Sequence, residues 1–304
     1  MADQFSYEVP NRVLQVMPTP MVSVRTITYN HAKYIERAIE GVLMQETDFP
    51  FEYLIGEDFS NDGTREIVLR YAERYPERIR VFTADRNVGI RENLQRVRRG
   101  FRGKYLAFCE GDDEWTDPLK LQKQVDIMES DPAIAGCFHR TRQEFLEGLD
   151  RVPRLFGDHG DRTVLGVEDT ISSRALCHTS AFMYRAGIPL DTEASKGIYS
   201  GDMLLFSMVA GAGPLVCIPE VMSVYRKHPG GISEEHGAGR GFHENRILML
   251  DRMDQFHEFK YHDRVEEVKG HHLRALERLR EQERRHGGGL RERLRRWLAP
   301  VLGR

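Results

Sequence analysis

Residues 105–124, YLAFCEGDDEWTDPLKLQKQ, join a short apolar run to a dense group of acids. The run at 105–109 predicts a buried strand, and four acids follow it at positions 110, 112, 113 and 114. Carboxylates this close repel one another, and each of them resists leaving water. The stretch therefore predicts that a positively charged group binds at the end of a strand.

The chain around this stretch alternates short apolar runs with longer amphipathic runs from residue 21 onward. This alternation predicts an α/β fold with a mixed, mostly parallel sheet and helices on both faces. The predicted strands are 22–28, 51–58, 79–84 and 104–113, and the predicted helices are 29–45, 64–77 and 92–101.

The pattern weakens beyond residue 130. Strand character returns at 131–145 and at 176–185, with a loop-rich segment between them, and a helix is predicted at 200–213. Helices are also predicted within 240–283, and the GGG at 287–289 predicts a break before the last stretch. The C-terminal part is therefore expected to be a helical extension.

The net charge and the cysteines argue against several classes of protein. A formal net charge of -3 gives no field that would hold DNA or RNA, so no nucleic-acid partner is expected. The four cysteines form no CxxC pair, which disfavours a zinc site or a disulfide framework and fits a reducing cytoplasm. No signal-peptide core is present, and no stretch approaches the roughly 20 apolar residues that span a bilayer. We therefore expect a cytoplasmic protein that binds small ligands.

Three polar clusters follow the predicted strands: TYNH at 28–31, EDFSNDGT at 57–64 and EGDDEW at 110–115. In sheets of this kind, ligands bind outside the carboxyl ends of the strands. Residues 60–64 are also ordinary turn formers, and Asp62 or Thr64 could cap the next helix, so a purely structural role stays open for them. The three clusters together favour a ligand-binding edge.

Five segments in this order resemble the family 2 glycosyltransferases, which have the GT-A fold. They are TITYNHAKYIERAIEGVLMQ at 26–45, LIGEDFSNDGT at 54–64, GKYLAFCEGDDEWTDPLKLQKQ at 103–124, SGD at 200–202 and VYRKHPGGIS at 224–233. The resemblance implies transfer of a hexosyl group from a nucleotide-sugar donor to a hydroxyl acceptor, usually with inversion and a divalent cation. Polysaccharide, glycolipid or natural-product glycan synthesis would be the setting.

The resemblance also implies a division of the chain. A catalytic domain at 21–235 would consist of a nucleotide-binding half at 21–115 and an acceptor-binding half at 116–235. An N-terminal extension at 1–20 would precede it, and a helical region at 236–304 would follow it.

A divalent cation would explain the acidic cluster, because Mn²⁺ or Mg²⁺ binds hard carboxylate oxygens together with substrate phosphates. The resemblance implies that Asp112 and Asp113 contact the metal and the donor ribose. Glu110 stands where the family commonly has aspartate, which puts its ligation in doubt. His228 would complete the metal shell or contact the diphosphate. The alternatives are that the acids cap the helix near Asp117 and that His228 is a surface histidine.

The donor's base and phosphates would lie at the same edge. By the resemblance, Thr28, Tyr29 and Asp58 surround the nucleobase, and Glu57 replaces the usual first acid. Uracil or thymine has an N3–H donor that suits a carboxylate acceptor, which favours a UDP-sugar or dTDP-sugar. Arg91 is a candidate for the phosphates. Core packing for Tyr29 and a solvated position for Arg91 remain alternatives.

Inverting transfer requires a general base for the acceptor hydroxyl. Asp202 in the SGD segment matches the catalytic carboxylate of the family, at the predicted start of a helix. An N-cap role would account for the same residue. The helix N-terminus is expected to lower the pKa of Asp202.

The last stretch, LRERLRRWLAPVLGR, forms a basic amphipathic pattern over 290–302, with tryptophan on its apolar side. Such a helix can lie in a membrane interface, which would suit a lipid-linked acceptor, at the inner face of a cytoplasmic membrane. The same apolar stripe could instead pack on the catalytic domain or on a second copy of the chain.

Two other functions remain open. A sugar nucleotidyltransferase has a similar sheet, but it usually carries a GxGTR-like loop where this chain has TYNHAKY at 28–34. A non-catalytic scaffold that binds nucleotide sugars on the same fold is the third hypothesis. Release of nucleoside diphosphate in the presence of Mn²⁺ would separate the scaffold from an enzyme.

Overall fold

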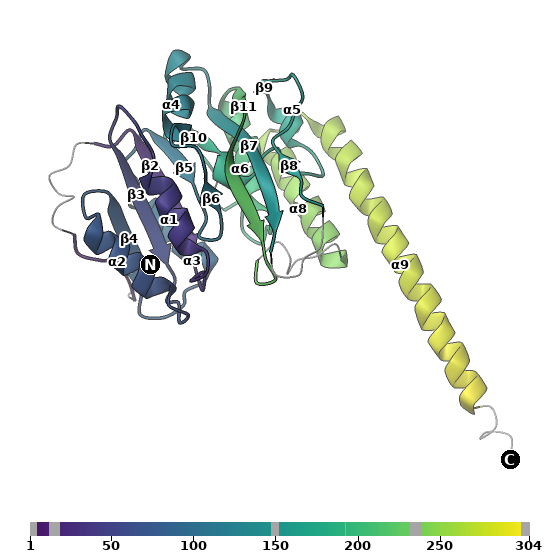
Figure 1. Ribbon diagram of the computed structural model, residues 1–304. Helices are drawn as coiled ribbons and strands as arrows, with labels where there is room; N and C mark the ends of the chain where they lie inside the picture. The colour runs from purple at the N-terminus through teal and green to yellow at the C-terminus, as the bar shows by residue number, and fades with distance from the viewer. Residues whose placement is uncertain (1–4, 12–18, 147–151, 192, 232–238, 299–304) are drawn as a thin grey trace.

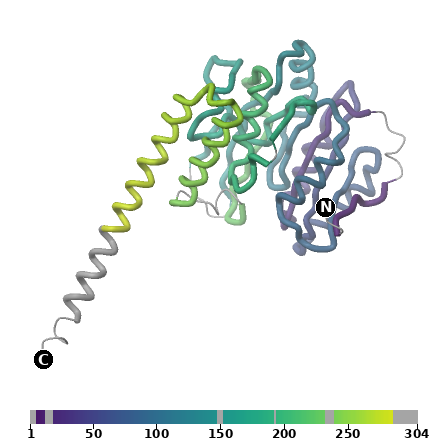
Figure 2. Tube along the Cα trace, turned by 180° about the vertical axis from the view of Figure 1, so that it is seen from behind, coloured from purple at the N-terminus to yellow at the C-terminus, as the bar shows by residue number. Residues whose placement is uncertain are grey.

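The computed structural model describes residues 5–11, 19–146, 152–191, 193–231 and 239–298, and within 285–298 it describes the backbone alone. One mixed sheet forms the body, with helices packed on both of its faces (Figures 1 and 2). Along the sheet the strands follow the order β1-β4-β3-β2-β5-β10-β7-β11-β6. The predicted α/β fold class is confirmed.

The first half of the sheet is parallel, as the sequence predicts. Its strands are β2 (Val22–Thr28), β3 (Phe51–Glu57), β4 (Ile79–Ala84) and β5 (Tyr105–Phe108). The register pairs Thr28 with Glu57, and Arg25 with Phe108. The segments that leave β2, β3 and β5 therefore emerge at one edge of the sheet.

Helices with apolar stripes cover both faces of this half. In α1 (Ile35–Leu43) the buried residues Ile35, Ile39 and Val42 recur at helical spacing. They share a core with α2 (Thr64–Arg74) and α4 (Lys120–Ser130). Helix α3 (Ile90–Arg98) packs on the opposite face through Val97. The result is a three-layer arrangement.

The second half is built around two long parallel strands, β7 (Gly136–Phe145) and β11 (Leu215–Lys227). Strand β10 (Met183–Arg185) lies antiparallel between β5 and β7, and it is the only strand segment within 176–185. The remaining short elements are β1 (Ser6–Glu8), β6 (Glu114–Trp115), β8 (Leu155–Phe156), β9 (Val164–Leu165), α5 (Val167–Thr170) and the 3-10 turn η2 (Thr179–Ala181).

Three helices complete the described chain. Helix α6 (Gly201–Ala212) packs against α8 (Arg240–Phe256) in a core that also holds Val265 and Val268 of α9 (His262–Leu298). Helix α9 then runs away from the body (Figure 1). In the described part of the chain, no helix is both long and apolar enough to cross a bilayer.

The predicted helix break at 287–289 is wrong, because α9 continues through these glycines to Leu298. A glycine in a helix interior costs only about 1 kcal/mol relative to alanine. Arginine, glutamate and leucine dominate both flanks, and these residues favour the helix. Three glycines therefore weaken this helix without ending it.

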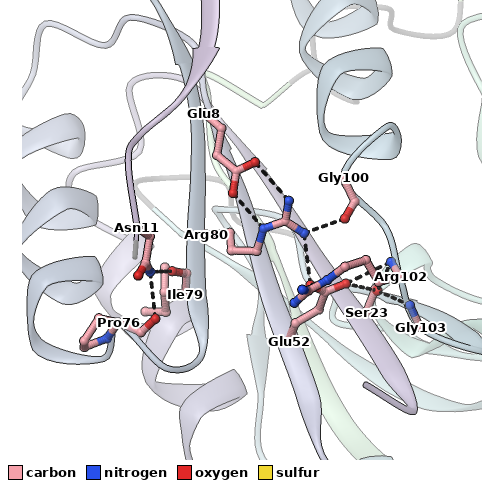
Figure 3. A network of polar contacts seen from close by, with 10 residues as sticks. All are labelled: Glu8, Asn11, Ser23, Glu52, Pro76, Ile79, Arg80, Gly100, Arg102 and Gly103. Atoms are coloured by element: carbon pink, nitrogen blue, oxygen red, sulfur yellow. Dashed lines mark hydrogen bonds and ion pairs between the residues drawn. The ribbon is translucent and has the colours of Figure 1, made fainter. Parts of the chain in front are cut away.

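A network of polar contacts around a buried acid lies at the starts of β2 and β3, the ends opposite the polar clusters. Figure 3 shows its contacts. Glu52 of β3 is buried and accepts a hydrogen bond from the Ser23 hydroxyl at 2.6 Å. Its other oxygen lies 3.0 Å from Arg80 Nη1 and 2.7 Å from Arg102 Nη2. Arg80 also pairs with the half-exposed Glu8 at 2.7 Å.

Replacing Glu52 by Ala should lower the free energy of unfolding by about 2 to 4 kcal/mol, because it removes the buried acceptor of the Ser23 hydroxyl and of Arg102 and leaves Arg80 with only the exposed Glu8 as its counter-charge. Urea unfolding measures this loss. Glu8→Ala is the matched control, since it removes the exposed partner of the same Arg80 and should cost less than about 1 kcal/mol. Equal losses in the two variants would contradict this account.

Candidate active site

The polar segments predicted to meet at one edge of the sheet do meet. The backbone N–H of Asp58 donates to the Thr28 carbonyl at 3.1 Å, and the Gly111 N–H donates to the Ile27 carbonyl at 3.1 Å. The clusters after β3 and β5 are thus both bonded to the end of β2. Backbone hydrogen bonds fix the floor of this edge before any side chain is considered.

Three side chains above this floor form a group suited to a cation. His31, Asp112 and His228 each offer one ligand atom, and these atoms lie within 4.8 Å of one another. His228 Nε2 is 3.3 Å from Asp112 Oδ2, and the His228 ring lies 4.6 Å from the Tyr34 ring. His228 is buried, so the alternative of a surface histidine is wrong. Carboxylate and imidazole are both ligands of divalent metals.

His31 was not predicted as a site residue, although it closes the quoted TYNH cluster. Its Nδ1 lies 3.3 Å from the Thr28 hydroxyl, at the end of β2. Gly111 makes this packing possible, because a Cβ at that position would lie 2.7 Å from His31 Nδ1 and 2.6 Å from Thr28 Oγ1. The sequence did contain a signal for this residue: His31 follows shortly after the end of β2, and Gly111 lies among the acids that follow β5.

Two of the four clustered acids have cationic partners within the chain itself. Glu110 forms an ion pair with Arg25 and also accepts from the Ile27 N–H at 3.2 Å. Glu114 forms an ion pair with Arg226 of β11. Arginine side chains therefore compensate Glu110 and Glu114, and the predicted positive group is needed only beside the two aspartates.

Opposite pKa shifts separate Asp112 from Asp113. Burial raises the pKa of Asp113 well above its usual value, and the charges of Asp112 and Glu110 add to this effect. Burial also acts on Asp112, but the hydrogen bond from His228 and the charge of His31 outweigh it and lower the pKa of Asp112. Asp112 is therefore the ionised member of the pair, the form that a metal requires.

Asp113 lies outside the group formed by His31, Asp112 and His228. Its Oδ2 is 3.7 Å from His178 Nδ1, and its buried Oδ1 has no hydrogen-bond partner among the described residues. An unpartnered buried carboxyl oxygen is uncommon and indicates a missing ligand or a protonated acid. A role for Asp113 in metal binding stays a prediction.

Asp58 is held in one orientation at the end of β3. Its two carboxylate oxygens accept hydrogen bonds from the N–H groups of Val88 and Gly89 at 3.0 and 2.9 Å. Arg96 lies 3.5 Å from the same carboxylate. Asp58 is only 2% exposed. An ionised carboxylate has about four lone-pair sites, and a contact between Asp58 and a nucleobase stays a prediction.

Glu57 likewise has protein partners for both of its carboxylate oxygens. The Ser60 N–H donates to Oε1 at 2.6 Å, and the Thr83 hydroxyl donates to Oε2 at 2.9 Å. The side chain is fully buried. These contacts brace the turn after β3, and a direct contact between Glu57 and the donor stays a prediction.

The other predicted donor contacts differ in exposure. Thr28 is buried beneath His31, whereas Tyr29 is 44% exposed, so the alternative that Tyr29 packs in the core is wrong. Arg91 is at the surface, where its Nη2 lies 3.3 Å from Glu193 Oε1. A phosphate contact for Arg91 would require this exposed ion pair to open.

Asp202 lies in the first turn of α6, and Ser200 occupies the N-cap position without a side-chain cap. The expectation of a lowered pKa is wrong. Burial raises the pKa of Asp202, and this effect exceeds the opposing influence of the Arg246 charge and of the nearby backbone N–H groups. A carboxylate with a raised pKa is a stronger base than an ordinary aspartate.

Asp202 and Asp113 each lie near one of two consecutive residues, Cys177 and His178. The charge of Asp202 acts on the buried thiol of Cys177, whose pKa is raised first by burial and then by this charge. The next residue, His178, is the neighbour of Asp113 described above. The loop at 177–178 therefore links the two parts of the candidate site.

A family model described as Glycosyl transferase family 2 matches residues 23–187, more than half of the chain. The chain belongs to this family. The match covers Thr28, Asp58, Asp112 and Asp113, and it ends before Asp202 and His228.

Curated relatives include the uncharacterised protein Rv1520 of Mycobacterium tuberculosis, which is 37% identical over 211 residues. That alignment spans 69% of this chain and 60% of the relative's length. The putative teichuronic acid biosynthesis glycosyltransferase TuaG of Bacillus subtilis is 38% identical over 109 residues, which are 36% of this chain and 42% of TuaG.

Solved structures show the same fold. The S. aureus TarS fragment 1–349 in complex with UDP-GlcNAc has a TM-score of 0.57 at 20% identity and covers 78% of this chain and 71% of its own. The mannosyltransferase PcManGT from Pyrobaculum calidifontis, in complex with GDP-Man and Mn²⁺, has a TM-score of 0.57 at 14% identity and covers 88% and 75%. The predicted GT-A architecture is confirmed.

Proposed function

We propose that this glycosyltransferase is metal-dependent and inverting, and that it moves a sugar from a nucleoside-diphosphate sugar to a hydroxyl acceptor. The observation that carries the proposal is the group formed by His31, Asp112 and His228 at the carboxyl edge of the parallel half-sheet. The catalytic domain would be residues 21–235, with donor binding in 21–115 and acceptor binding in 116–235.

The residues of this group fit a divalent cation. Asp112 offers an ionised oxygen, the two histidines offer imidazole nitrogens, and Mn²⁺ or Mg²⁺ is the favoured ion. When bound, the cation would act as a Lewis acid toward the leaving diphosphate. Asp113 would support Asp112 from the buried side of the loop.

Asp58 would select the donor base. Its carboxylate, fixed by two backbone N–H groups, would accept the N3–H of uracil or thymine, so a UDP-sugar or dTDP-sugar is favoured. TarS was solved with UDP-GlcNAc, which supports this choice, whereas PcManGT was solved with GDP-Man. Thr28, Tyr29 and Glu57 would surround the base, and Arg91 would reach the phosphates.

Asp202 would be the general base. Its carboxylate would remove the proton of the acceptor hydroxyl while that oxygen attacks the anomeric carbon. Attack from the face opposite the diphosphate breaks the bond between the anomeric carbon and the phosphate oxygen, and the configuration inverts. The proton remains on Asp202, and the nucleoside diphosphate departs.

The acceptor would be a carbohydrate, lipid-linked or small hydroxyl compound. The name of TuaG, a teichuronic acid biosynthesis glycosyltransferase, supports a role in cell-wall or other polysaccharide synthesis. The basic amphipathic segment 290–302 would contact the inner face of a membrane or a second copy of the chain. Its residues up to Leu298 belong to α9, and 299–302 lie outside the described residues.

Thermal unfolding with a panel of UDP-GlcNAc, UDP-glucose, dTDP-glucose and GDP-mannose, each with and without Mn²⁺, tests this function. One donor together with Mn²⁺ should raise the melting temperature by about 5 °C at 100 times its dissociation constant. Release of nucleoside diphosphate from that donor would then separate an enzyme from a scaffold. Stabilisation that does not depend on Mn²⁺ would contradict the proposed metal.

A further inference from the structure

A side chain of α8 holds the turn that leads into α6. The Asn245 Oδ1 accepts a hydrogen bond from the Tyr199 N–H at 2.7 Å, and its Nδ2 donates to the Gly197 carbonyl at 2.6 Å. Gly197 has a φ of 79°, which a residue with a Cβ rarely adopts. One amide therefore clamps both sides of a tight turn that ends just before Asp202.

The next residue of α8 approaches the first turn of α6 itself. The Arg246 guanidinium contacts the Met203 sulfur and lies 3.7 Å from the Met249 sulfur, with its Cζ 5.1 Å from the Phe242 ring centroid. Its Nε is buried and has no hydrogen-bond partner among the described residues. Thioethers and an aromatic ring screen a charge poorly, so the cation acts strongly on its neighbours.

Asp202 is the acid on which this charge acts. Burial lowers the pKa of Arg246, and the charge of Asp202 acts in the opposite direction. In the same way, burial raises the pKa of Asp202, and the charge of Arg246 acts against this rise. The Cys177 thiol also feels the Asp202 charge, and burial, the larger cause, raises its pKa and favours the neutral thiol. Arg246 is thus the cation that favours the ionised form of Asp202.

Packing fixes the distance between the two helices. At the far end of α8, His257 Nε2 lies 2.9 Å from the Ser207 hydroxyl of α6. A Cβ at Gly211 would lie 2.9 Å from the His257 ring, so the helices approach closely there. Met249, Leu250 and Met253 of α8 are buried in the same core as α6.

We propose that Asn245 and Arg246 are positioning residues for the base: Asn245 sets the backbone entry to Asp202, and Arg246, held against Met203 beside Asp202, keeps the Asp202 carboxylate ionised. The helical region after the catalytic domain is then part of the active site. The family match ends at residue 187, so Asp202, Asn245 and Arg246 lie in a part of the chain that the family model does not cover. The inference rests on the proposed role of Asp202.

The test measures nucleoside diphosphate release over pH, with Mn²⁺ and the panel donor that stabilises the protein most. Arg246→Gln should move the acidic limb of the kcat profile upward by about 1 pH unit and leave the donor KM unchanged. Arg246→Lys should keep the limb within about 0.3 unit of the wild type, because the charge remains. Asn245→Ala should lower kcat about 10- to 100-fold without changing the donor KM.

Arg240→Gln is the matched control, because it removes an exposed cation from the same helix, where Arg240 pairs with Glu283 at 2.7 Å. In this control variant the acidic limb of the kcat profile should stay at the wild-type pH. An unchanged pH profile in Arg246→Gln, while Asp202→Asn abolishes release, would overturn the positioning role and leave the base assignment intact. Release that survives Asp202→Asn would overturn the base assignment itself. Should Arg246→Gln fail to fold, an unchanged kcat in Asn245→Ala decides against the proposal.

Discussion

Replacing Asp202 by Asn should lower the rate of sugar transfer about 10²- to 10⁴-fold, the usual contribution of a general base. The metal-dependent affinity for the donor should not change, because Asp202 lies on α6 and is not part of the group formed by His31, Asp112 and His228. Steady-state kinetics would show the loss in kcat, and thermal unfolding with donor and Mn²⁺ would show intact binding.

The pH profile gives a second readout of the same residue. Because burial raises the pKa of Asp202, transfer should be present above this raised pKa and should fall as the pH drops through it. The acidic limb should therefore lie above the ordinary aspartate value of about 3.9 and should disappear in Asp202→Asn. Ser200→Ala is the control, since Ser200 makes no side-chain cap and its loss should change the rate less than about threefold. A full rate in Asp202→Asn would show that another group is the base.

The parallel half of the fold follows from sequence alone for a clear reason. Strand β2 is a short, almost continuously buried run, whereas the buried residues of α1 recur at helical spacing, so the two elements have different sequence patterns. Since consecutive parallel strands end at the same edge, the convergence of Thr28, Asp58 and the acids after β5 could also be predicted. In the second half, most of 176–185 does not extend a strand, because its side chains fold against Asp113 and α6.

What the sequence could not supply were contacts between distant residues. His31 joins Asp112 because Gly111 leaves room for its ring, and this depends on the register of β2 and β5. The pKa of Asp202 is raised because the effect of burial exceeds the opposing effect of the backbone N–H groups at the helix N-terminus. Whether a residue at a helix end is buried cannot be predicted from the local sequence. Arg25 and Arg226 compensate Glu110 and Glu114 from strands far away in the chain.

Replacing Asp112 by Asn should weaken Mn²⁺-dependent donor binding at least about 100-fold. Loss of a residue that only supports a metal ligand typically costs 10- to 100-fold in affinity, and the loss of a charged ligand should cost no less. The amide keeps the shape of the side chain but removes the charge that His31 and His228 stabilise. Isothermal titration of Mn²⁺ in the presence of donor would measure the change, and His31→Ala should show a loss in the same direction.

Two neighbouring acids supply the controls for this experiment. Glu110→Gln should retain Mn²⁺-dependent binding within about threefold, because Arg25 and the Ile27 N–H are the partners of Glu110 and it lies outside the group of His31, Asp112 and His228. Asp113→Asn should lose less than Asp112→Asn, about tenfold, because the raised pKa of Asp113 already favours a neutral side chain of nearly the same shape. If Glu110→Gln abolished binding and Asp112→Asn did not, the cation would lie deeper in the cluster and would replace Arg25 as the partner of Glu110, and the group of His31, Asp112 and His228 would not be the metal site.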